Sequence, residues 1–168
     1  QLVGTTDQIS ENNFWLTMLW DGKVGLDLRG ATYAPNVNHF WGGHFSVQST
    51  TNPAQTAYGV RFSREASGYN SHNANTFYGP EFQMGHSSRT GGAEGIPIRF
   101  EVNASQNGFY SVRGENTASS FIESTAAAFE NVCEILFSNN GYGDVIRHTS
   151  TATKNWGLLE NARYSTLA

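Results

Sequence analysis

Hydrophobic and polar residues alternate with a period of two along much of the chain. Apolar side chains occupy every second position in the segments 24–28, 45–47, 58–62, 82–84, 96–102 and 110–112. Because a strand points successive side chains to opposite faces, each of these segments is predicted to be a half-buried strand. The pattern predicts an all-β fold.

Pairs of turn-forming residues separate several of these segments. Asp21-Gly22, Asn107-Gly108 and Asn140-Gly141 each lie between apolar or aromatic stretches. Such pairs adopt the positive φ angles that tight hairpins need, so we expect neighbouring strands to be antiparallel, most clearly between Ile96 and Val112. The expected architecture is an antiparallel, jelly-roll-like β-sandwich, with a β-solenoid segment as the alternative.

One stretch fits a helix and a strand equally well in its periodicity. The Ala126-Ala127-Ala128 run favours helix, and apolar residues from Phe129 to Leu136 recur at helical spacing. The same region also alternates with period two as far as Phe137. We therefore keep a short helix near 121–136 open and favour a strand after Phe129.

The length and the composition suit one folded domain. A chain of 168 residues with 13% aromatic and only 14% charged residues carries enough apolar area to fold, and its polarity comes from Gly, Asn, Ser and Thr. It begins at Gln1 without a methionine and ends on Leu167 and Ala168. We interpret residues 1–168 as a single all-β domain cut from a longer polypeptide.

Charge and cysteine content exclude several function classes. The net charge of −4 without any Lys or Arg run makes nucleic acid an improbable partner. No apolar run approaches the roughly 20 residues of a membrane helix, so membrane insertion is not expected. A single cysteine, Cys133, excludes an internal disulfide and a multi-cysteine zinc site. We expect no cofactor.

The densest cluster of functional side chains runs from His39 to His44. The two histidines are five residues apart, which places them on opposite faces of a regular strand, and no third metal ligand lies near. We therefore predict no metal site. Trp41 either stacks on a sugar ring or packs in the core beneath Gly42-Gly43, and both interpretations stay open. Trp15 and Trp20 are expected in the core.

A second candidate region combines aromatic rings with amides and hydroxyls. It runs from Tyr69 to Tyr78 and includes His72, a composition found in adaptable recognition surfaces. Arg89 could anchor the carboxylate of an acidic sugar. The predicted ligand-binding residues are His39, Trp41, His44, Tyr69, His72, Tyr78 and Arg89.

No catalytic residue can be assigned from sequence. The chain has no Gly-x-Ser-x-Gly elbow, and Cys133 lies in an apolar segment that favours a buried, inert thiol. Glycoside hydrolysis uses two carboxylates, but nothing in the sequence selects a pair among acids such as Glu81, Glu94, Glu101 and Glu115. The sequence leaves open whether this fragment is an enzyme, and the missing signatures favour a non-catalytic module.

The C-terminal stretch supplies a family likeness. Residues 129–150 and 156–161, with short apolar strands between Asn-, Ser- and Gly-rich turns, resemble the distal domains of bacteriophage tailspikes and tail fibres. That resemblance implies a homotrimer on the virion tail, or another extracellular assembly, that recognises or depolymerises bacterial surface polysaccharide, with this chain as the non-catalytic end of a depolymerase as one form of it. The alternatives are a glycan hydrolase or lyase domain and a free-standing lectin-like module.

Overall fold

The computed structural model of the protein is built from β-strands. It describes residues 2–4, 9–20, 23–46, 56–66, 68, 71–84, 95–115, 120–125, 128–138, 144–148 and 156–160. These residues form sixteen strands, and no helix occurs among them. The prediction of an all-β fold is confirmed.

The strands form three sheets, which we call sheets I, II and III. Sheet I contains β1 (Leu2–Gly4), β3 (Val24–Gly30), β5 (Ala57–Arg64), β9 (Gly95–Phe100), β12 (Ser120–Ser124) and β15 (Asp144–His148). Sheet II contains β6 (Ser71–Asn73), β10 (Asn103–Ser105) and β13 (Ala128–Phe129). Sheet III contains β2 (Asn13–Trp20), β4 (His39–Ser46), β7 (Thr76–Tyr78), β8 (Glu81–Gln83), β11 (Gly108–Glu115), β14 (Asn131–Ser138) and β16 (Trp156–Glu160).

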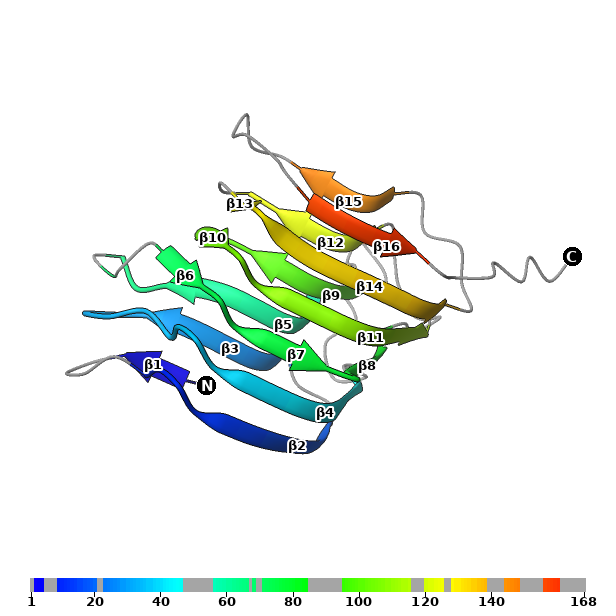
Figure 1. Cartoon of the computed structure of the whole chain (residues 1–168), viewed down its shortest axis with the longest axis horizontal. Helices are drawn as coiled ribbons and strands as arrows, with labels where there is room; N and C mark the ends of the chain where they lie inside the picture. The colour runs from blue at the N-terminus through cyan, green and yellow to red at the C-terminus, as the bar shows by residue number, and fades with distance from the viewer. Residues whose placement is uncertain are drawn as a thin grey trace, which may run out of the picture.

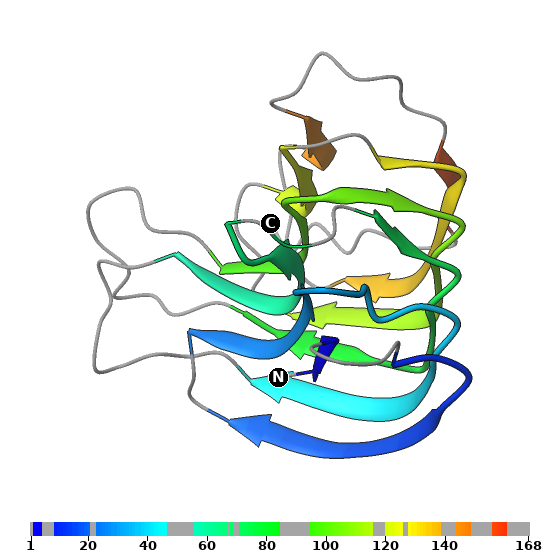
Figure 2. The same cartoon turned by 90° about the vertical axis from the view of Figure 1, so that its left-hand side faces the viewer.

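The chain winds through the sheets in turn, and each passage, or coil, stacks on the one before it (Figures 1 and 2). In Figure 1 the strands of sheet III lie in chain order from β2 at the bottom towards β16 at the top. Every described strand pair is parallel, for example β2 with β4 and β11 with β14. These coils form a parallel β-solenoid, the alternative that the sequence left open.

The prediction of an antiparallel sandwich is therefore wrong. The expected hairpin from Ile96 to Val112 is instead part of one coil, in which β9 belongs to sheet I, β10 to sheet II and β11 to sheet III. Period-two alternation is the same in parallel and antiparallel strands, so it could not distinguish them. Asp21-Gly22 and Asn140-Gly141 lie outside the described residues.

The short helix that was kept open near 121–136 does not occur in the described part of that segment. Residues 120–124 and 131–138 are the strands β12 and β14. The preference for a strand after Phe129 is confirmed. Pairing with β11 on one side and β16 on the other determines this outcome, since tertiary context overrides a local ambiguity.

Aromatic rings at equivalent positions of successive coils form the core. The rings of Phe14 and Phe40 stack with centroids 5.0 Å apart, those of Phe40 and Phe77 at 4.4 Å, and those of Phe77 and Phe109 at 4.6 Å. Cys133 in β14 occupies the next position of this column. It is fully buried, as predicted, and this burial raises the pKa of its thiol. Parallel in-register stacking therefore converts one apolar position per coil into a continuous core.

A buried asparagine ladder runs beside the phenylalanine column, at the start of sheet III. The side-chain oxygen of Asn107 accepts hydrogen bonds from the backbone N and Nδ2 of Asn75 at 3.0 and 3.1 Å. Asn38 and Asn75 make the same pair of bonds, as do Asn107 and Asn131. These bonds satisfy buried polar groups and hold successive coils in register.

Candidate functional site

Exposed apolar side chains gather on the outward face of sheet III. Three of the five exposed large apolar side chains among the described residues lie on β2 and β4: Trp15 is 76% exposed, Met18 56% and Trp41 40%. Their neighbours Phe14 and Phe40 point inward, to the core. A cluster of exposed apolar side chains on a folded protein is characteristic of a binding surface.

Four aromatic side chains on this face occupy equivalent positions in four consecutive coils. We call them the aromatic row: Trp15, Trp41, Tyr78 and Tyr110. The rings of Trp41 and Tyr78 stack at 4.3 Å with 17° between their planes, and those of Tyr78 and Tyr110 at 5.6 Å with 19°. The Trp41 indole N–H also donates to Asn13 Oδ1 at 3.4 Å. Trp41, Tyr78 and Tyr110 therefore form a continuous stack, in which each ring covers part of its neighbour.

Trp15 differs from the other members of the row. It is in register with Trp41, yet it stacks on no described ring and is the most exposed large apolar side chain among the described residues. The expectation that Trp15 lies in the core is wrong, because the inward position of this strand is taken by Phe14. The side chain of Trp20 lies outside the described residues. Trp15 thus presents the most accessible ring of the row.

A second line of side chains, which we call the charged row, follows the aromatic row across the same face. It consists of His44, Glu81 and Arg113, at equivalent positions on β4, β8 and β11. His44 Nδ1 lies 3.5 Å from Glu81 Oε2, with both side chains partly exposed. The face thus combines aromatic rings with polar groups that can bond a ligand.

A local break in β4 brings both histidines to this outward face. Gly42 and Gly43 have φ angles of 70° and 99°, and a Cβ on Gly43 would lie 3.0 Å from Phe45. The bend interrupts the inside–outside alternation, so His39 and His44 both point outward although they are five residues apart. The expectation that the two histidines lie on opposite faces assumed a regular strand, and the bend at Gly42 and Gly43 makes β4 irregular.

The structure brings four of the predicted ligand-binding residues together on this face: His39, Trp41, His44 and Tyr78. His72 is placed elsewhere: it is fully buried at sheet II with its ring edge-on to Phe62, and burial lowers its pKa to about 4. Tyr69 and Arg89 lie outside the described residues. Among the described ligand-binding candidates of the second region, Tyr78 therefore lies beside those of the first and His72 does not.

Sequence reasoning missed Trp15, Tyr110 and Arg113 as members of the face, although a signal for the row exists. Each member follows the same pattern of an asparagine, any residue and a phenylalanine, at residues 12–15, 38–41, 75–78 and 107–110. The asparagines of this pattern, Asn12, Asn38, Asn75 and Asn107, are 26, 37 and 32 residues apart. Because these spacings are unequal, the pattern does not stand out as a repeat of fixed period.

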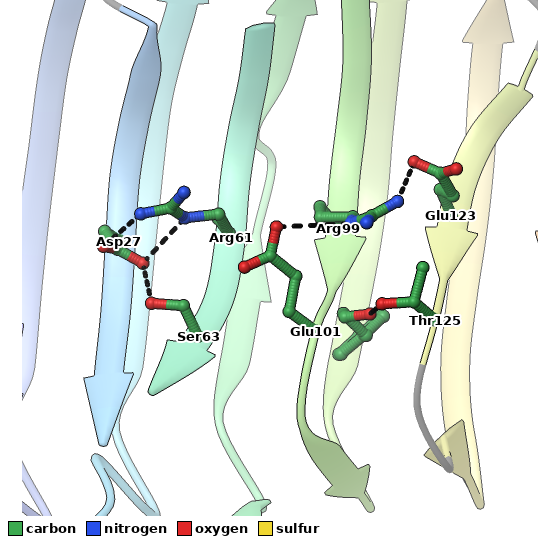
Figure 3. A network of polar contacts seen from close by, with 8 residues as sticks. Asp27, Arg61, Ser63, Arg99, Glu101, Glu123 and Thr125 are labelled. Atoms are coloured by element: carbon green, nitrogen blue, oxygen red, sulfur yellow. Dashed lines mark hydrogen bonds and ion pairs between the residues drawn. The ribbon is translucent and has the colours of Figure 1, made fainter. Parts of the chain in front are cut away.

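The outward face of sheet I carries a different arrangement, in which charged groups bond one another (Figure 3). The Arg61 guanidinium donates to both carboxylate oxygens of Asp27, at 3.2 and 2.7 Å, and the Ser63 hydroxyl donates to Asp27 Oδ1 at 2.6 Å. The hydrogen bond to Asp27 raises the pKa of Arg61. Asp27 is buried and has its charge compensated.

The same network continues across the next two coils. Arg99 lies between two carboxylates, at 3.5 Å from Glu101 and in direct contact with Glu123, and its guanidinium lies 5.6 Å from the centre of the Tyr58 ring. Burial raises the pKa of Tyr58. Because each of these carboxylates has an arginine partner, we interpret the network as part of the fold, not as a ligand site.

Among the described residues, no group of three His, Cys, Asp or Glu side chains could hold a metal ion. The described part of the chain also contains no helix that is long and apolar enough to cross a membrane. Comparison of the sequence and structure with protein-family models, curated proteins and solved structures gives no match. The geometry of the faces therefore carries the functional argument.

Proposed function

We propose that this chain is a polysaccharide-binding module that contacts its glycan through the outward face of sheet III. The observation that carries the proposal is the aromatic row, in which Trp15 and Trp41 are exposed and Tyr78 and Tyr110 are half-buried, whereas the column of Phe40, Phe77 and Phe109 beneath it is fully buried. A sugar ring has an apolar C–H face and a rim of hydroxyl groups. Aromatic rings bordered by hydrogen-bonding groups complement both features.

The repeat of the solenoid also suits a polymer. Equivalent side chains on neighbouring coils are about 4.8 Å apart, the spacing of paired strands. A polysaccharide lying along the solenoid axis would therefore meet similar groups at each step. Asn13, His39 and Thr76 follow the aromatic row on one side, and the charged row follows it on the other.

The assembly belongs to the same proposal. The likeness of the C-terminal stretch to tailspike and tail-fibre domains supports a homotrimer on a phage tail or another extracellular structure that binds bacterial surface polysaccharide. Native mass spectrometry distinguishes this from a free-standing lectin-like module. A trimer is expected, whereas a monomer at high protein concentration would favour the lectin-like alternative.

Glycan cleavage is the second candidate function, and the His44–Glu81 contact is the observation that favours it. A histidine oriented by a carboxylate is a common arrangement for a general base, and this pair lies one row away from the aromatic row. Glycan cleavage is tested by incubating the protein with the polysaccharides that it binds and analysing the products. New reducing ends or unsaturated products that disappear in His44→Gln would assign the cleavage to this pair.

The binding proposal is tested by replacing the most exposed ring of the row. Trp15→Ala should weaken the binding of bacterial surface polysaccharides by about 1 kcal/mol or more, roughly fivefold, in calorimetric titrations. Tyr33→Ala is the matched control, since Tyr33 is an exposed aromatic residue outside sheet III. Equal affinities for the two variants would count against this face as the binding site.

A further inference from the structure

We infer that the glycan is an acidic polysaccharide and that Arg113 binds its carboxylates. This inference rests on the proposed function and adds the chemical class of the ligand. It follows from the distribution of charge on the outward face of sheet III, where both described acidic side chains have partners and the arginine has no ion-pair partner among the described residues.

The first acidic side chain on this face is Glu81. Its Oε2 atom lies 3.5 Å from His44 Nδ1, so the carboxylate is oriented towards the histidine on β4. Arg113 is on the opposite side, at the equivalent position of β11. Although the register places Glu81 beside Arg113, no ion pair forms between them.

The second acidic side chain is Glu134, which follows Tyr110 in the line of equivalent positions. Its Oε2 accepts a hydrogen bond from the backbone N–H of Ser111 at 2.9 Å. Ser111 has a φ of 56°, a left-handed conformation that accompanies an irregularity in the pairing of β11 with β14. The carboxylate of Glu134 is thus hydrogen-bonded to the backbone of β11, next to the aromatic row.

Arg113 is the only Arg or Lys in the strands of sheet III. Its side chain is exposed, and no described carboxylate lies within ion-pair distance of it. The contrast with Arg61 and Arg99 on sheet I is direct, since each of those contacts one or two carboxylates. An exposed arginine that has no described ion-pair partner and lies near the partly exposed ring of Tyr110 is available to a ligand.

The position of Arg113 fits one sugar chemistry in particular. A uronic acid carries an apolar ring face and a carboxylate at its rim, so the ring can contact Tyr110 while the carboxylate reaches Arg113 three residues further along β11. The planar guanidinium donates two parallel hydrogen bonds to a carboxylate, a geometry that a neutral hydroxymethyl group does not match.

The experiment compares each glycan with its own neutral form. A panel of acidic bacterial polysaccharides is used before and after carbodiimide activation and borohydride reduction of the carboxyl groups, which converts each uronic acid to the neutral sugar. The wild-type protein should bind the native glycan at least tenfold more tightly than the reduced one. Arg113→Gln should lose that preference and keep the affinity for the reduced glycan, and Arg113→Lys should retain part of the preference.

Arg64→Gln is the matched control, because Arg64 is also exposed but lies at the end of β5 in sheet I. It removes the same charge and should leave the preference intact. Equal binding of native and reduced glycans by the wild-type protein would overturn the inference while leaving the proposed function in place. Binding of no polysaccharide would overturn both, and equal effects of the Arg113 and Arg64 variants would overturn the assignment of Arg113.

Discussion

The outward faces of sheets I and III are built on the same coils and differ in what they stack. Sheet III stacks like on like, with aromatic rings above one another and an arginine that lacks a described partner. Sheet I places carboxylates beside arginines, and Asp27 and Glu123 are buried there. A parallel solenoid brings equivalent side chains about 4.8 Å apart, so rings can repeat in every coil but charges must be compensated.

This difference separates a face that holds the fold together from one that is free to bind. On sheet I the charged side chains use their hydrogen-bonding groups to bind one another, as the bidentate contact of Arg61 with Asp27 shows. On sheet III three rings of the aromatic row stack on one another, and Trp15 leaves most of its ring exposed to solvent. We therefore expect mutations on sheet I to change stability and mutations on sheet III to change binding.

The largest effect should come from Asp27→Ala on sheet I. The substitution leaves the Arg61 guanidinium and the Ser63 hydroxyl without their shared acceptor, and breaking a buried pair from one side costs about 3–5 kcal/mol. Urea unfolding measures the loss. Glycan affinity at 25 °C should be unchanged for the folded protein, and a matching loss of affinity would remove the distinction between the faces.

A second large effect belongs to the interior between these faces. Burial holds the pKa of His72 at about 4, below its ordinary value of about 6.5, so between these pH values the unfolded chain binds more protons than the folded one. Stability should therefore fall as the pH drops from about 6.5 to 4, by about 3 kcal/mol in total.

Urea unfolding at several pH values checks this prediction, with His72→Phe as the control. The variant cannot be protonated, so its stability should depend less on pH in this range even if the larger ring lowers stability overall. An unchanged pH dependence would assign the acid sensitivity to other groups. Glycan affinity should be the same in His72→Phe and the wild-type protein, since His72 lies on sheet II and not on sheet III.

The sequence predicts the parts of this fold that depend on one strand and misses those that depend on stacked coils. Alternation identifies β3, β5 and β9 from their own residues. The choice between antiparallel and parallel pairing depends on partners 24–37 residues away, as the asparagine ladder shows. Asn107 illustrates the failure: beside Gly108 it predicts a hairpin turn, whereas its side chain is a buried link between coils.

The candidate site was predictable to a similar extent. Trp41, His39, His44 and Tyr78 were recognised from local composition, and the structure places them on one face. Trp15 was assigned to the core because β2 is apolar on both faces, and only the stacking of Phe14 on Phe40 shows which side is inward. The proposed role of Arg113 depends on the register between β8 and β11, which the residues of one strand alone do not reveal.

An intermediate effect should distinguish two members of the aromatic row. Trp41 stacks on Tyr78, so Trp41→Ala should reduce both glycan affinity and stability, each by about 1 kcal/mol. Trp15→Ala should reduce affinity to a similar extent with a smaller change in stability, because Trp15 stacks on no described ring. Thermal unfolding beside calorimetric titration measures both quantities, and global unfolding of Trp41→Ala would show that its main role is in the fold.

The smallest effect should come from Glu81→Gln, the counterpart on sheet III of the Asp27 substitution. The His44–Glu81 contact is partly exposed and 3.5 Å long, and such surface pairs contribute about 0.2–1 kcal/mol. Urea unfolding should therefore show a loss several times smaller than that of Asp27→Ala. The substitution also removes a negative charge beside Arg113, so binding of acidic glycans should become slightly tighter, most visibly at low salt. A stability loss as large as that of Asp27→Ala would mean that sheet III, like sheet I, uses its charges to hold the coils together.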